Sequence, residues 1–196
     1  MRRSMDDNAI SRRPAALDGI LTDTNALGFN MASEPKVGAL LAALAASKPL
    51  GRILELGTGT GHGTAWLLFG MDAKATLDTV DTDPKVVAVA RRHLDTDYRV
   101  TFHIADSAQF VSQAPRGAFD LIYADAWPGK FSHLDEALAL LRPGGMYVID
   151  DLLPQPNWPE GHAPKVPILI DDIEGRDQFV TVRLGWASGL MIVTRR

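Results

Sequence analysis

The sequence predicts an α/β protein with one mostly parallel, doubly wound sheet that ends in an antiparallel hairpin. Short apolar stretches alternate with helical patterns along residues 53–149, which indicates five β-α units. The last part of the chain instead has two apolar stretches, 179–184 and 190–194, on either side of a Gly-containing turn. This is the pattern of a hairpin. Together these elements make a sheet of seven strands.

The size of the chain suits one domain. Its 196 residues are 46% hydrophobic, which is enough for a single three-layer core. We expect residues 31–196 to form this domain. Residues 1–30 mix charged and polar residues with weak helical periodicity, which predicts an N-terminal arm that is either frayed or packed on a second subunit of a homodimer.

Composition argues against several classes of protein. The net charge is −4 and basic residues form no long stripe, so we expect no nucleic-acid partner. The chain has no cysteine, which excludes disulfides and thiolate chemistry. We see no secretory signal and no apolar stretch that spans a bilayer, so we expect a cytoplasmic protein without a membrane partner.

A glycine-rich turn follows the apolar stretch 53–56. Glycines at 57, 59, 61 and 63 allow positive φ and let the backbone lie against a ligand, and the helix that follows points its N-terminal amides at the same place. The spacing differs from G-x-G-x-x-G because His62 stands at the third glycine, and no triphosphate P-loop is present. The turn predicts nucleotide contacts at Glu55, Gly57, Thr58, Gly59 and Gly61.

The second strand, residues 76–81, ends in an acid. Asp81 lies twenty residues beyond Gly61, which in a doubly wound sheet places its carboxylate within reach of a ribose diol. Asp83 and Pro84 follow as the N-cap and the first residue of a helix.

The remaining elements follow in order along the chain. Strands are predicted at 99–104, 119–125 and 146–150, and helices at 134–141 and 168–173. The stretch 142–145, Arg-Pro-Gly-Gly, is interpreted as the stop of the first of these helices. Residues 151–167 are rich in proline and aromatic residues, which predicts a lid or binding loop. Ser33 is interpreted mainly as the N-cap of a helix that opens at Ser33-Glu34-Pro35.

The pattern E-x-G-x-G-x-G at residues 55–61 resembles motif I of the class I S-adenosylmethionine-dependent methyltransferases, and the resemblance spans roughly residues 30–196. It implies a Rossmann-like sheet with strand order 3-2-1-4-5-7-6 and S-adenosylmethionine as cofactor. It also implies that Asp106 and Ser107 flank the adenine, that Ser33 contacts the amino-acid end of the cofactor, and that Asp125 lies beside it. The structural alternative for Asp106 is a helix N-cap, which is compatible with that role.

Three acids after the fourth and fifth strands, Asp125, Asp150 and Asp151, resemble the metal site of the catechol O-methyltransferase-like, cation-dependent enzymes. Asp151 stands where that family has Asn. Carboxylate oxygens suit Mg²⁺ or another hard divalent cation, and three adjacent carboxylates without one would repel each other. In the alternative, Asp151 points away as a cap or ion-pair partner and no tight metal site exists.

The resemblance also implies a lysine as general base, together with Asp125 at the reacting centre. The family has this lysine three residues after the fourth-strand acid, where the chain has Pro128, and Lys130 stands two residues later. A Pro-Gly turn could bring Lys130 back toward the acids. His133 is the competing base, because histidine commonly removes protons near neutral pH.

The function that follows is S-adenosylmethionine-dependent O-methylation of a small hydroxylated acceptor, with or without a divalent cation. Two alternatives remain. The departures at Pro128 and Asp151 are compatible with a protein that binds the cofactor without catalysing methyl transfer. An NAD-dependent oxidoreductase is disfavoured, because Tyr98, Tyr123 and Tyr147 are not followed by a lysine four residues later.

Overall fold

The computed structural model describes residue 6, residue 10 and residues 12–196, and these contain seven helices and seven strands. The helices are α1 Leu17–Leu27, α2 Pro35–Ala46, α3 His62–Gly70, α4 Pro84–Leu94, α5 Ser107–Gln113, α6 Leu134–Ala139 and α7 Lys165–Glu174. The strands are β1 Arg52–Leu56, β2 Thr76–Asp81, β3 Val100–Ile104, β4 Phe119–Ala124, β5 Leu141–Ile149, β6 Phe179–Leu184 and β7 Leu190–Arg195.

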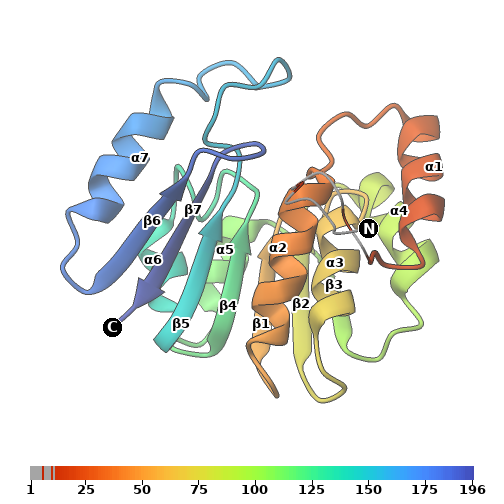
Figure 1. Ribbon diagram of the computed structural model, residues 1–196, viewed down its shortest axis with the longest axis horizontal. Coiled ribbons are helices and arrows are strands. Elements are labelled where there is room, and N and C mark those ends of the chain that lie inside the picture. The colour runs from red at the N-terminus through yellow and green to blue at the C-terminus, as the bar shows by residue number, and fades with distance from the viewer. Residues whose placement is uncertain (1–5, 7–9, 11) are drawn as a thin grey trace.

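The strands form one sheet in the order β3-β2-β1-β4-β5-β7-β6 (Figure 1). The pairs from β3 to β5 are parallel, whereas β7 runs antiparallel to both β5 and β6. The predicted doubly wound sheet with a C-terminal hairpin is therefore confirmed. Helices lie on both faces, so most side chains of β1 and β4 are buried, as is usual for parallel strands.

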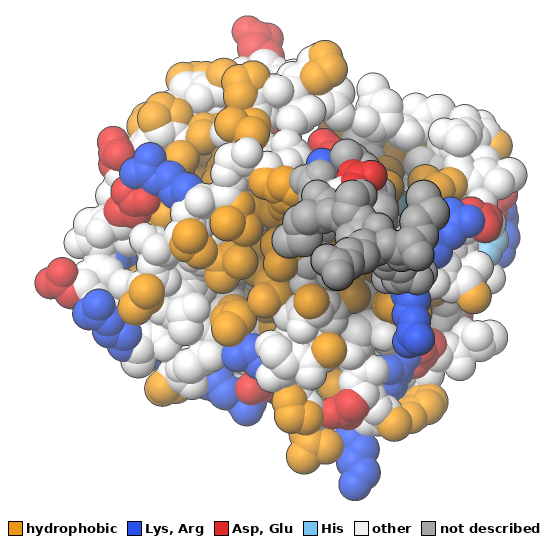
Figure 2. All heavy atoms as spheres, in the orientation of Figure 1, with side chains coloured by type: hydrophobic (Ala, Val, Ile, Leu, Met, Phe, Trp, Pro, Cys, Tyr) orange, Lys and Arg blue, Asp and Glu red, His pale blue; other side chains and the backbone are white. Residues whose placement is uncertain are grey.

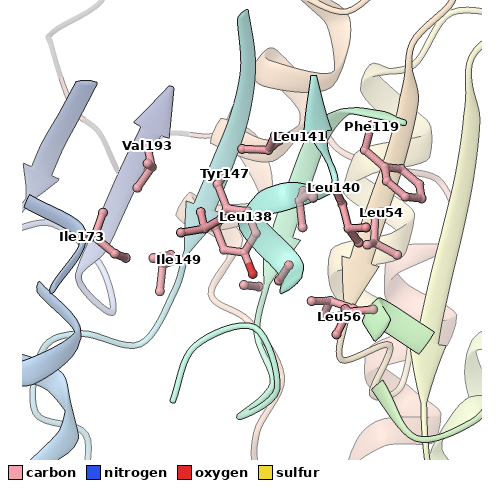
Figure 3. Close-up of a cluster of buried hydrophobic side chains, with 14 of the residues drawn as sticks. Leu54, Leu56, Phe119, Leu138, Leu140, Leu141, Tyr147, Ile149, Ile173 and Val193 are labelled. Atoms are coloured by element: carbon pink, nitrogen blue, oxygen red, sulfur yellow. The ribbon is translucent and has the colours of Figure 1, made fainter. Parts of the chain in front are cut away.

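The core lies on both faces of the central strands. Side chains alternate along β1, so Ile53 packs into one hydrophobic cluster while Leu54 and Leu56 pack into the other. Figure 3 shows the second cluster, in which Tyr147 of β5 lies near the β1 leucines. Burial on both faces fixes the register of β1 and thereby the position of the turn that follows it.

The C-terminal end of α6 differs from the predicted helix 134–141. The helix ends at Ala139, and Leu141 already pairs with Phe119 as the first residue of β5. The next pair is Leu121 with Met146, so the Arg-Pro-Gly-Gly stretch is a bulge inside the strand and not a helix stop. Strand pairing with β4 explains the difference, because a local turn pattern does not reveal a distant partner.

Part of the predicted N-terminal arm is a helix packed on the domain. Thr24 of α1 is buried and donates a hydrogen bond to Thr60 in the glycine-rich turn, at 2.8 Å. Asp23 accepts hydrogen bonds from Arg92 and His93 of α4. The arm prediction for residues 1–5, 7–9 and 11 lies outside the described residues.

Hydrophobic side chains gather on the viewed face between α2 and the hairpin strands (Figure 2). In β6, Val180 and Val182 are about half exposed. Among the described residues, no helix has both the length and the apolar character needed to cross a membrane.

Candidate active site

The carboxyl ends of β1, β4 and β5 bring the predicted site residues together. Leu56 pairs with Ala124, and Ala124 pairs with Ile149. The residues that follow these three, Gly57, Asp125 and Asp150, therefore begin at the same edge of the sheet. Open α/β sheets bind their ligands at this edge, next to the point where the strand order reverses.

A cavity of about 420 Å³ opens at this edge, a volume within the ordinary range for small-molecule sites. One side is the glycine-rich turn and the end of β2, and the other is formed by the ends of β4 and β5. Loops before α2 and after β5 cover it. Of the predicted site residues, those that line it are Ser33, Gly57, Thr58, Gly59, Asp81, Asp125, Lys130, Asp150 and Asp151.

The glycine-rich turn needs its glycines for two reasons. Gly57 and Gly59 have φ of 102° and 50°, a region that favours glycine. A Cβ on Gly57 would also lie 3.0 Å from the main-chain oxygen of Asp125. Asp81 holds the turn, because its carboxylate accepts a hydrogen bond from the Gly59 amide at 2.8 Å. The turn is thus preorganised, with its backbone facing the cavity.

Glu55 has a structural position beneath this turn. Its side chain is fully buried and accepts hydrogen bonds from Thr64 and Thr79. The described residues that line the cavity do not include Glu55. Burial raises the pKa of Glu55 to about 8, and these two hydrogen bonds oppose the shift. The carboxyl group links β1, β2 and α3 below the turn.

Other predicted residues also lie outside the lining set of the described chain. Gly61 faces α4, where a Cβ would lie 2.7 Å from the Ala90 side chain. Asp106 is exposed and caps α5 by accepting from the Ala108 amide, and Ser107 is buried at the start of that helix. His133 is the N-cap of α6 and lines a second, smaller cavity, which Lys130 also lines.

Lys130 lies against two of the three acids. Its Nζ atom is 3.9 Å from Asp125 Oδ1 and donates a hydrogen bond to the main-chain oxygen of Asp150 at 3.2 Å. The lysine side chain is only 3% exposed. The turn after β4, with Gly129 at φ 91°, carries Lys130 back over the strand end. Burial and the neighbouring Asp150 raise the pKa of Asp125 well above its usual range, against the opposing effect of Lys130.

Asp150 is held by residues that the sequence analysis did not identify. Its carboxylate accepts from Tyr123 at 2.6 Å, from Ser188 in the hairpin turn, and from the Asp151 amide at 2.6 Å. Ser33 contacts Tyr123 at 3.1 Å and donates to Asp125 at 3.2 Å. The capping role preferred for Ser33 is wrong, because Glu34 is the N-cap of α2 and no side chain caps it.

The Asp151 carboxylate has a different partner from the other two acids. Its φ of 67° is in the left-handed region, and its carboxylate accepts a hydrogen bond from the indole of Trp158. The main-chain oxygen of Asp151 contacts His162 Nε2 at 3.0 Å, and the His162 ring stacks on Trp158 with 4.3 Å between centroids. Asp151 therefore anchors the predicted lid loop.

The three acids do not fit a divalent cation. Both Asp150 carboxylate oxygens already accept hydrogen bonds, the Asp151 carboxylate binds the lid, and the Lys130 ammonium lies near Asp125. Across residues 6, 10 and 12–196, no three His, Asp or Glu side chains are arranged to hold a metal ion. The partner that the alternative expected for Asp151 is the Trp158 indole.

The other side of the cavity fits a nucleoside-containing ligand. The backbone of the turn and the Asp81 carboxylate line an open space. The amides of Gly57, Thr58 and Gly59 already donate to Val80 and Asp81, so the carboxylate is the main acceptor on this side. His62 and His162 also line the cavity, and each has a buried Nδ1 with no hydrogen-bond partner within the described part of the chain. Burial lowers the pKa of His62 to about 4, so its ring is neutral at physiological pH. Buried polar atoms of this kind normally have a partner.

The sequence comparison identifies the class of protein. A family model described as a methyltransferase domain matches residues 54–152, which includes the glycine-rich turn and all three acids. The chain therefore belongs to this methyltransferase family. The catechol O-methyltransferase of Niastella koreensis is 33% identical over 148 residues, covering 69% of this chain and 66% of the relative. For several other curated relatives, named as O-methyltransferases, the match spans about half of their length.

Solved structures show the same fold. The O-methyltransferase of Bacillus cereus, solved in complex with SAH, has a TM-score of 0.82 at 20% identity, with 97% of this chain and 94% of that chain covered. TomG of Streptomyces achromogenes, an O-methyltransferase solved in complex with SAM, has a TM-score of 0.81 at 21% identity, with 96% and 93% covered.

Proposed function

We propose that the protein is an S-adenosylmethionine-dependent O-methyltransferase that acts on a small hydroxylated acceptor. The observation that carries this proposal is a cavity in which the glycine-rich turn faces the buried Lys130 side chain and the partly exposed Asp125. Family membership and relatives named as O-methyltransferases support the same reaction class.

The cofactor side of the cavity is formed by the turn and the acid at the end of β2. Gly57, Thr58 and Gly59 give the nucleoside a close-lying backbone surface, and Asp81 accepts from the ribose hydroxyls while it holds the turn. Asp106 and Ser107 extend this side toward the adenine, because the Ala105 amide bonds to the Asp81 oxygen and places the start of α5 next to β2. Ser33 and Asp125 complete it near the acceptor. The bound cofactor supplies an electrophilic methyl group on a sulfonium.

On the acceptor side, the residues of the chain position one oxygen and receive its proton. The Lys130 ammonium donates to the acceptor oxygen and stabilises the negative charge that develops there. Asp125 accepts the proton, a role for which its raised pKa suits it near neutral pH. Asp150 and Tyr123 help to position Lys130 and Asp125. Lys130 donates to the main-chain oxygen of Asp150, and Tyr123 donates to the Asp150 carboxylate.

Calorimetry and turnover together test the proposal. We expect S-adenosylhomocysteine to bind and NAD not to bind under the same conditions. In a panel of phenols and catechols, Lys130→Met should reduce kcat by about 10²-fold or more, because an oriented charge at the reacting oxygen is lost. Lys74→Met, at an exposed position before β2, is the matched control and should leave kcat unchanged.

Each alternative function predicts a different result. Binding of S-adenosylhomocysteine with no turnover on any acceptor would favour a cofactor-binding protein without methyl-transfer activity. Binding of NAD in its place would favour an oxidoreductase and overturn the proposal.

A further inference from the structure

The buried Lys130 side chain lies near both Asp125 and Asp150, where a positive charge would offset the two carboxylates. Asp125 and Asp150 directly follow Ala124 and Ile149, which are paired at the ends of β4 and β5. Two neighbouring carboxylates repel each other unless a positive charge lies near them. Lys130 Nζ supplies that charge, 3.9 Å from Asp125 and bonded to the Asp150 main chain.

The third acid is unavailable to an ion for a separate reason. Asp151 binds the Trp158 indole, and its backbone oxygen contacts His162, so its side chain belongs to the lid. A divalent cation binds hard oxygen ligands, so at this site it would have to be coordinated by the Asp151 carboxylate or by free carboxylate oxygens of Asp150. The Asp150 oxygens already accept from Tyr123, Ser188 and the Asp151 amide.

We propose that the Lys130 ammonium takes the place of a divalent cation in this site, so that the protein neither binds nor requires one. An ammonium has three hydrogens, and Lys130 lines the cavity while it contacts Asp150. One acceptor oxygen accepts a hydrogen bond from the Lys130 ammonium. If a metal ion were bound, that oxygen would coordinate the ion. Because no ion chelates two oxygens, the acceptor needs a single hydroxyl group. The inference deepens the proposed function and rests on it for the role of the acceptor.

Mn²⁺ binding tests the inference without turnover. Mn²⁺ takes the same carboxylate and water ligands as Mg²⁺ and is observed directly by electron paramagnetic resonance. The full-length chain is titrated with Mn²⁺, with and without S-adenosylhomocysteine. Each protein is compared with the same protein carrying Asp125→Asn, so that only binding at this site is counted.

We expect the unmodified chain to bind Mn²⁺ at this site with a Kd weaker than ~1 mM. Lys130→Met removes the ammonium, and we expect its Mn²⁺ affinity at this site to be at least ~10-fold higher. Lys130→Gln provides a polar side chain of similar length in case the Met variant does not fold. Lys74→Met removes an exposed lysine just before β2, at the end of the parallel strands opposite the cavity. Its Mn²⁺ affinity should equal that of the unmodified chain.

Two results overturn the inference. The first is Mn²⁺ binding by the unmodified chain at a Kd below ~1 mM that Asp125→Asn abolishes. The second is a folded Lys130 variant whose Mn²⁺ affinity equals that of the unmodified chain. Neither result depends on methyl transfer, so a failure here is distinguishable from a failure of the proposed function.

Discussion

Asn157 donates a hydrogen bond from its side-chain amide to the main-chain oxygen of Asn30, at 2.8 Å. Asn157 lies in the loop after β5 and Asn30 in the loop before α2, and residues of both loops line the active-site cavity. This bond joins two loops that are distant in the sequence. Together they cover the cavity.

Loss of the bond between the two loops should make the cover open more readily. An ordinary hydrogen bond contributes about 0.5–1.5 kcal/mol, so we expect Asn157→Ala to raise the dissociation rate of S-adenosylhomocysteine by about 2–10-fold. Stopped-flow tryptophan fluorescence measures this rate. Asn25→Ala, at an exposed position of α1, is the control, and equal rates in the two variants would show that this bond does not retain the ligand.

Asp81 has two roles that one substitution removes together. Its carboxylate accepts from the Gly59 amide at 2.8 Å and from the Asp83 amide at 3.0 Å, and it faces the cavity where a ribose would bind. We expect Asp81→Ala to weaken S-adenosylhomocysteine binding by ~1–3 kcal/mol in calorimetry. Asp177→Ala removes an exposed acid before β6 and should leave the Kd unchanged. An unchanged Kd in Asp81→Ala would refute the ribose assignment.

Glu55 should give the protein a distinctive dependence of stability on pH. Its pKa is about 8 in the folded chain and 4.5 in the reference state, because burial disfavours the charged form. Between these values the folded state holds a proton that the unfolded state has lost. The free energy of unfolding therefore falls as the pH rises from about 4.5 to about 8.

Glu55→Gln removes this contribution because glutamine does not ionise. We expect the stability of the variant relative to the unmodified chain to rise between pH 5 and pH 7.5, by on the order of 2–3 kcal/mol, in urea unfolding. Glu160→Gln alters an exposed residue of the lid loop and serves as control. A stability difference that does not change with pH would show that Glu55 is ionised in the folded protein.

Gly70 allows α3 to pack closely on α2. A Cβ at this position would lie 1.9 Å from the main-chain oxygen of Ala42, which cannot move without shifting the helix. We expect Gly70→Ala to lower the free energy of unfolding by ~2–3 kcal/mol in denaturant titrations. At Gly185 a Cβ would meet no atom of the described residues within 4 Å, so Gly185→Ala should have little effect. If Gly70→Ala and Gly185→Ala had equal free energies of unfolding, α2 and α3 would be shown to separate slightly at little cost.

Features that depend on neighbours in the sequence were predicted well. Asp83 caps its helix as expected, and Asp106 caps α5 as its structural alternative described, because each cap is a hydrogen bond from an amide two residues away. Strand β2 has the predicted bounds, since its pattern ends at Asp81, a partly buried acid that lines the cavity. Ser33 was misinterpreted because its partners, Tyr123 and Asp125, are ninety or more residues away.

The sequence by itself determined the class of fold and the cofactor turn, because hydrophobic periodicity and glycine spacing are local properties of the chain. The family resemblance also singled out the three acids and Lys130, and all four line one cavity. Only the tertiary structure decided what each one contacts: the lysine lies between Asp125 and Asp150, whereas Asp151 binds the lid. The physical reason is that the direction of a strand-end side chain depends on the backbone conformation of its turn and on partners such as Trp158 and Ser188. Those partners are brought to the site only when the lid loop and the hairpin pack against it.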